Sequence, residues 1–235
     1  KVYYSYTVMK KIFLNVIFFL LISFNLNAHV SHYKNFKKIE MEIFRNDQLI
    51  GFNYYFFEKD KNVIKVKNQT KIIVKLFGAT VFDLEGYGEE KYINEELVSY
   101  NSKTKQNKKD KFVNLLLDKK TNKLVIKGSS YTGNAKIENV VGNWWNHKLL
   151  QAESQISPIS GSIKSQIVTF IAKEKINLYG KVYEAEHFKL KSKNSDLPDD
   201  KKLNFDIWLH KDTGLILKVK YSRMGDWEYR LKSYE

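Results

Sequence analysis

The sequence predicts an all-β protein in which a curled antiparallel sheet forms an incomplete barrel of roughly eleven strands. Apolar and polar residues alternate with a period of two along most of the chain after residue 37, which is typical of strands with one buried and one solvated face. Short turn segments separate these runs and favour hairpins between sequential strands. A single sheet of this size must curl or close to bury its apolar face.

The alternation is clearest between residues 62 and 77. Ile64, Val66 and Ile72 share one face of this run, whereas Lys65 and Lys71 share the other. The same pattern continues on both sides of it. The expected strands are residues 38–43, 49–58, 62–77, 80–92, 97–105, 112–117, 124–128, 163–172, 181–191, 203–210, 215–222 and 227–233.

The alternation lapses between residues 129 and 162. This stretch contains Trp144-Trp145 and a short helical candidate at residues 146–153. We therefore expect one short helix or lid segment that closes the incomplete barrel.

Residues 9–28 have the pattern of a bacterial secretory signal peptide, in which Lys10 and Lys11 precede an apolar run and a small residue at Ala28. The run is more interrupted than a membrane span of roughly 20 apolar residues, although an uncleaved anchor is the alternative. We expect residues 1–8 to be an upstream extension, residues 29–36 a flexible tail and residues 37–235 a single β domain that works in the periplasm.

The composition excludes several classes of protein. The chain has no cysteine, which excludes disulfides, thiolate metal sites and a cysteine nucleophile. Its formal net charge of +14 would favour an anionic membrane surface as a partner, although the codon bias of an AT-rich genome also enriches lysine. No motif points to nucleic acid, and the oligomeric state is left open.

Several stretches resemble one family. They are residues 45–51 (RNDQLIG), residues 90–100 (EKYINEELVSY), Trp145-Asn146, and residues 206–209 (DIWL) followed by Thr213-Gly214. In this order they resemble the exported bacterial proteins of the domain of unknown function 6134 family, over about residues 37–232. The broader relatives of that family resemble the open β-barrels of periplasmic lipoprotein carriers. The resemblance implies a fold and a compartment, and it implies no chemistry.

Trp144 and Trp145 are the leading candidates for ligand contact. Adjacent tryptophans outside a strand do not both point into one core in regular structure, so one of them would line a cavity. The alternative is that both are packing residues of the lid. Tyr54 and Phe56 share one face of a strand that carries aromatic side chains on both faces, so that strand is either covered twice or faces a ligand.

A polar patch is the second candidate. Asp206, Trp208 and His210 fall on one face of an expected strand, and His187 lies on the strand before it. In such a patch His210 would accept a proton and a carboxylate would orient it. A solvated outer face is the alternative, because no Gly-x-Ser-x-Gly motif accompanies these residues.

Paired carboxylates occur near one hairpin end, at Glu89-Glu90 and Glu95-Glu96. Such pairs hydrolyse glycosides when their separation is right. Hairpin ends are also commonly charged for solubility, and we favour that interpretation here.

The leading hypothesis is therefore a periplasmic binding or carrier-type module for a lipid-like or otherwise amphipathic small molecule, which would bind to an apolar concave face. One alternative is a cofactor-free enzyme that uses the patch of Asp206 and His210. Another is a structural or assembly partner that pairs through a sheet edge. We expect no cofactor and no metal site, and the sequence does not decide whether the protein catalyses a reaction.

Overall fold

The computed structural model describes Tyr33 and residues 35–235, and within them fifteen strands form one sheet. The first eight strands are β1 (Lys38–Arg45), β2 (Gln48–Asp60), β3 (Val63–Leu76), β4 (Ala79–Ile93), β5 (Glu96–Gln106), β6 (Lys109–Asp118), β7 (Lys123–Gly128) and β8 (Thr132–Lys136). The others are β9 (Val140–Val141), β10 (Ser154–Ile156), β11 (Ile163–Leu178), β12 (Lys181–Ser192), β13 (Asn204–His210), β14 (Ile216–Ser222) and β15 (Asp226–Tyr234).

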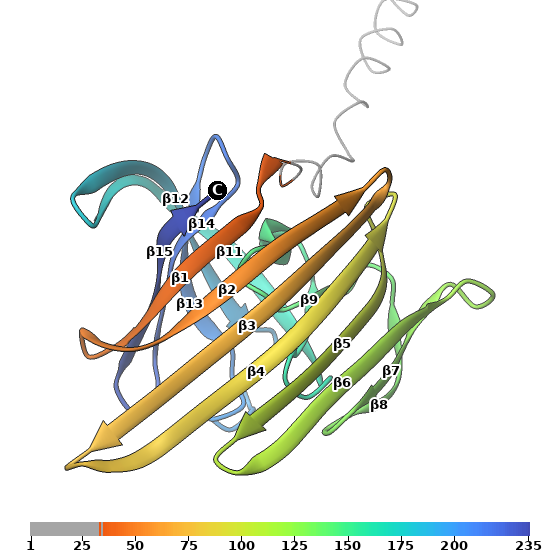
Figure 1. Cartoon of the computed structure of the whole chain (residues 1–235), viewed down its shortest axis with the longest axis horizontal. Coiled ribbons are helices and arrows are strands. Elements are labelled where there is room, and N and C mark those ends of the chain that lie inside the picture. The colour runs from red at the N-terminus through yellow and green to blue at the C-terminus, as the bar shows by residue number, and fades with distance from the viewer. Residues whose placement is uncertain (1–32, 34) are drawn as a thin grey trace, which may run out of the picture.

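The strand order shows an open sheet. It runs β8-β7-β6-β5-β4-β3-β2-β1-β15-β14-β13-β12-β11-β10-β9, so β1 pairs with both β2 and β15, and β8 and β9 are the two edges. Every pairing is antiparallel except that of β9 with β10. In Figure 1 the sheet curls so that β13 and β11 lie behind the long strands β2 to β5. The predicted all-β class and open antiparallel sheet are confirmed.

The predicted strand count and the predicted helix are wrong. Three of the fifteen strands, β8, β9 and β10, match none of the expected ranges, and all three fall in residues 129–162, where the alternation lapses. They are short and are held by partners elsewhere in the sheet, so no local pattern identifies them. The expected helix at residues 146–153 is only a 3-10 turn, η2 (His147–Leu150), capped by the Asn146 side chain, which accepts a hydrogen bond from the Lys148 backbone N–H.

Two-residue turns in the left-handed region set the hairpin registers. Asn46-Asp47 has φ angles of 48° and 61°, and Asn94-Glu95 has 51° and 67°. Positive φ at both central residues is the type I′ geometry, which matches the right-handed twist of paired strands. Asparagine adopts positive φ more readily than most residues, which explains why it opens these turns.

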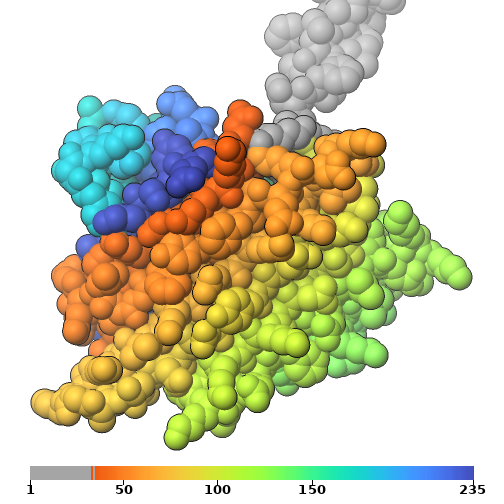
Figure 2. Space-filling view, in the orientation of Figure 1, coloured from red at the N-terminus to blue at the C-terminus, as the bar shows by residue number. Residues whose placement is uncertain are grey.

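The inner face of the curled sheet carries two apolar clusters. The larger includes Met41, Tyr55 and Trp145. The smaller lies around Ile72 and Trp227. Successive residues of a strand face opposite sides of the sheet. Lysines that alternate with these apolar residues, such as Lys71 beside Ile72, therefore face outward. Figure 2 shows the convex outer surface that the first strands present to solvent.

Tyr33 lies in the segment expected to be a flexible tail, yet its side chain is fully buried. Its ring packs on Trp145 and Phe57. The predicted signal peptide (9–28) and upstream extension (1–8) lie outside the described residues. Within the described part of the chain, no helix is long and apolar enough to cross a membrane.

Candidate binding site

The segment that carries the two tryptophans crosses the inside of the curled sheet. Trp145 is 1% exposed and makes edge-to-face contacts with Phe57 and Tyr92, at ring-centroid distances of 5.5 and 5.8 Å. These partners come from β2 and β4, far from Trp145 in sequence. Trp145 is therefore a core residue that connects its own segment to strands β2 and β4.

A buried carboxylate anchors this tryptophan. The indole N–H of Trp145 and the side-chain amide of Asn143 each donate to Glu90 Oε1 at 2.7 Å, and the Tyr92 hydroxyl donates to Oε2. Glu90 is 1% exposed. All three donors are neutral, so burial dominates and raises the pKa of Glu90 above its ordinary value, although the three hydrogen bonds act in the opposite direction.

Trp144 has a different environment. It is half-buried, and its ring packs edge-on against Phe205 at 5.1 Å and lies 6.1 Å from the ring of Tyr229. Its backbone N–H donates to the Tyr55 hydroxyl at 3.0 Å. Trp144 also lines a small cavity inside the sheet. Of the adjacent pair, Trp144 is thus the one that borders an internal space.

Tyr54 and Phe56 do not join the tryptophans. Tyr55 and Phe57 take the inner positions of β2, which leaves Tyr54 half-buried and Phe56 exposed on the outer face. Lys38 Nζ lies 4.8 Å from the ring centroid of Tyr54. The structure therefore places these two predicted ligand contacts on the opposite side of the sheet from Trp144.

The polar patch forms around His187 instead of His210. His187 Nε2 lies 3.0 Å from Asp206 Oδ1, and the His187 ring stacks on Trp208 at 4.4 Å. His210 instead contacts Thr213 in its own turn, where its Nδ1 lies 3.0 Å from the Thr213 hydroxyl. The structure therefore brings Asp206 and Trp208 together with His187 and leaves His210 apart from them, because the antiparallel register places Trp208 opposite His187.

An ion pair and contacts of the His187 ring tie this patch together. Lys189 Nζ lies 2.7 Å from Asp206 Oδ2, and Glu174 Oε1 lies 3.3 Å from His187 Nδ1. Burial alone would raise the pKa of Asp206, but hydrogen bonds from Lys189 and His187 outweigh it and lower that pKa. The carboxylate of Asp206, held by Lys189 and His187, links β12 to β13 on the outer face of the sheet. Within the described residues, no group of three His, Cys, Asp or Glu side chains is placed to hold a metal ion.

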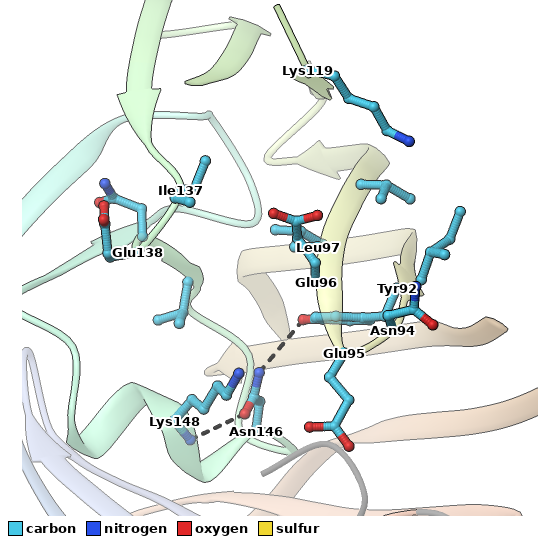
Figure 3. Close-up of a pocket in the computed structure, with 14 residues that line it drawn as sticks. Tyr92, Asn94, Glu95, Glu96, Leu97, Lys119, Ile137, Glu138, Asn146 and Lys148 are labelled. Atoms are coloured by element: carbon cyan, nitrogen blue, oxygen red, sulfur yellow. Dashed lines mark hydrogen bonds between the residues drawn. The ribbon is translucent and has the colours of Figure 1, made fainter. Parts of the chain in front are cut away.

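A large groove opens at one end of the sheet. It has a volume of about 750 Å³ and lies between the β4–β5 turn on one side and residues 137–148 on the other. Figure 3 shows these two walls facing each other, with Asn146 reaching across to Tyr92. The Asn146 amide donates to the Tyr92 hydroxyl at 3.5 Å, and the same hydroxyl binds Glu90. Tyr92 and Asn146, which line the groove, thus connect it to the buried carboxylate of Glu90.

The groove has apolar walls and a charged rim. The apolar lining residues are Tyr92, Ile93, Leu97, Val98, Ile137 and Val140. The charged lining residues are Glu95, Glu96, Glu138, Lys119 and Lys148. In Figure 3 Lys119 and Lys148 lie at opposite ends of this opening. Such a lining can bury an apolar group while it contacts a polar group of the same molecule.

The sequence did not identify most of this groove. Its residues come from four segments that only the fold brings together, so no local motif marks them. The sequence pattern could have identified Glu90 as a buried carboxylate, because it occupies an inner position of its strand, two residues before Tyr92. The paired-carboxylate hypothesis placed it at a charged hairpin end, whereas Glu90 is buried and only its neighbour Glu89 faces outward.

One solved structure supports the fold. The structure is similar to a crystal structure of a β-barrel-like protein of the domain of unknown function DUF1849 from Brucella abortus, with 9% identity and a TM-score of 0.57, over 84% of this chain and 96% of that one. A Bacteroides fragilis protein with a YmcC-like fold aligns over 84% of this chain and 94% of its own, with 10% identity and a TM-score of 0.34. No curated protein matches the chain.

The family resemblance expected from residues 45–51, 90–100 and 206–209 is confirmed. The model of the domain of unknown function DUF6134 matches residues 41–232, and the chain therefore belongs to the DUF6134 family.

Proposed function

We propose that the protein is a binding or carrier-type module that takes one amphipathic small molecule in the groove between the β4–β5 turn and residues 137–148. The observation that carries this proposal is the groove itself. Its volume of about 750 Å³ falls in the range of ligand sites, and its walls combine apolar side chains with charges of both signs.

The driving force would be burial of the apolar part of the ligand. Each Å² of apolar surface removed from water contributes roughly 25 cal/mol, so about 200 Å² contributes roughly 5 kcal/mol before the losses of ligand freedom are subtracted. The polar part would remain at the rim, near Lys119 and Lys148 or near the glutamates. The hydrogen bonds from Asn146 to Tyr92 and from Tyr92 to Glu90 hold the two walls together.

This proposal places the ligand at the end of the barrel and not on its concave face. Trp145 and its neighbours in the larger apolar cluster fill that face. Partnership through a sheet edge has less support, because β8 has five residues and β9 has two. Export to the periplasm and attraction to an anionic membrane remain proposals that rest on residues 9–28 and on the net charge of +14.

Titration with a fluorescent fatty acid tests the proposal. The wild type should bind saturably, and Ile137→Arg should weaken binding at least tenfold because a charged side chain would enter the apolar wall. Ile171→Arg is the matched control, since Ile171 is 51% exposed on β11 and does not line the groove. Absence of saturable binding, or equal affinities for the two variants, would overturn the proposal.

A further inference from the structure

A belt of neutral polar side chains crosses the inner face of the sheet between the two apolar clusters. It runs through Asn53 on β2, Asn68 and Thr70 on β3, and Ser102 and Thr104 on β5. These positions point into the barrel, where apolar residues are the rule. Burial of polar groups is costly unless they find partners, so a belt of this kind in a core needs an explanation.

The belt surrounds a cavity of about 100 Å³, which Asn143, Trp144 and Tyr229 border from the opposite side. This cavity shares no lining residue with the groove. The buried carboxylate of Glu90 lies between the two spaces, since it accepts from Asn143 of the cavity and from Tyr92 of the groove.

Two glycines border this region. Gly86 and Gly88 occupy consecutive inner positions of β4, and Gly86 lines the cavity. A Cβ atom on Gly88 would lie 2.2 Å from Asn68 Oδ1 and 2.9 Å from the Tyr100 hydroxyl, so a larger residue there would displace these two side chains. A Cβ atom on Gly86 would lie 3.1 Å from Thr104 Oγ1 and would narrow the cavity.

Some polar atoms of the belt have hydrogen-bond partners within the protein, and one buried atom does not. The Thr70 hydroxyl donates to Asn53 Oδ1 at 3.0 Å, and the Ser102 hydroxyl donates to the Pro158 carbonyl at 2.7 Å. Asn68 Oδ1, by contrast, is buried without a hydrogen-bond partner among the described residues. An unpaired buried acceptor costs free energy, and a ligand that donates a hydrogen bond would remove that cost.

The lining also defines the charge of the ligand. Among the residues that the structure describes, no Asp, Glu, Lys, Arg or His side chain lines the cavity. A charged ligand would lose its hydration without gaining a countercharge, whereas a hydroxyl group can both donate to Asn68 and accept from neighbouring groups. The volume corresponds to about three water molecules at liquid density, which is close to the size of a small triol.

We infer that this cavity is a second binding site, distinct from the groove, for a small neutral polyol or for the hydroxyl-bearing end of a larger neutral molecule. Asn68 turns its amide toward the cavity to accept from the ligand, and Trp144 borders the site from the opposite side. The inference does not depend on the proposed function of the groove.

The test is a titration followed by backbone and side-chain amide NMR. Glycerol and erythritol should cause saturable shifts that centre on Asn68 and Ser102. Propan-1-ol, which lacks the additional hydroxyls, and glycolate, which carries a charge, should bind at least tenfold more weakly. Asn68→Leu should abolish the saturable shifts, whereas Asn101→Leu, on the exposed face of β5, should leave them unchanged.

Three outcomes would overturn the inference: no saturable shift with either polyol, equal shifts in Asn68→Leu and the wild type, or shifts centred outside the cavity. The first of these would mean that the cavity holds water alone. If Asn68→Leu does not fold, Gly86→Ala decides, because its added methyl group narrows the cavity and should weaken polyol binding at least tenfold. These variants alter no groove residue, so they should still bind the fatty acid. Fatty-acid binding thus distinguishes a failure of the polyol site from a failure of the proposed function.

Discussion

Glu90 is a carboxylate buried among neutral donors, and its position makes the stability of the protein depend on pH. Burial raises the pKa of Glu90 in the folded state. Between the ordinary pKa of a glutamate and that raised value, the folded protein binds more protons than the unfolded chain. Stability therefore falls as the pH rises through this window. The nearby phenols of Tyr55, Tyr92 and Tyr100 have raised pKa values and stay neutral there.

We expect Glu90→Gln to remove this dependence. The glutamine oxygen can still accept from Trp145 and Asn143, while its amide donates to the Tyr92 oxygen. Urea unfolding of both proteins from pH 4 to pH 8 should show that the variant gains stability over the wild type as the pH rises. A difference in unfolding free energy that is constant across this range would contradict the account of Glu90.

The two adjacent tryptophans should differ in their effect on stability. Trp145→Ala removes a fully buried aromatic and one donor to Glu90, so we expect a loss of about 3–5 kcal/mol. Trp144→Ala removes a half-buried ring, so its loss of unfolding free energy should be smaller than that of Trp145→Ala by at least about 1 kcal/mol. Thermal and urea unfolding of both variants measures this, and equal losses would mean that Trp144 is as much a core residue as Trp145.

At the scale of elements, the β3–β4 hairpin extends beyond its neighbours, as its tip in Figure 1 shows. The turn is Phe77-Gly78, with φ angles of 49° and 81°. Phe77 is fully exposed. A bulky residue is disfavoured in the left-handed region, and this one gains no burial in return.

Phe77→Asn should therefore stabilise the hairpin, because asparagine tolerates positive φ and no buried contact is lost. We expect a gain of about 0.5–1 kcal/mol, which corresponds to a rise of a few degrees in Tm. Differential scanning calorimetry measures this change. A lower Tm for the variant would show that Phe77 makes a stabilising contact.

Most elements were predictable because their information is local. Strands such as β3 alternate over 14 residues, and this fixes both their type and their buried face. Strands β8 to β10 were not predictable, since two to five residues carry too little pattern. The choice between His187 and His210 as the partner of Asp206 stayed open for a related reason. A sequence shows which residues share a face, but the pairing of β12 with β13 decides that His187 is the neighbour.

At the scale of the whole molecule, the curled sheet separates three environments along its inner side. The larger apolar cluster holds Trp145, the polar belt surrounds the small cavity, and the smaller apolar cluster holds Trp227. The groove opens at the end where the β4–β5 turn lies. The sequence predicted an open barrel with an apolar concave face, but it did not predict the polar belt, because Asn53 and Asn68 look like ordinary outward positions without the register.

Native mass spectrometry of protein purified without denaturants tests the central claim most directly, namely that the groove at the end of the barrel binds an amphipathic molecule. We predict that the wild type carries one additional mass that organic solvent removes. Ile137→Arg should lose it and Ile171→Arg should retain it. A wild type without any bound mass, or a bound mass that Ile137→Arg also retains, would contradict the assignment of the groove as the binding site.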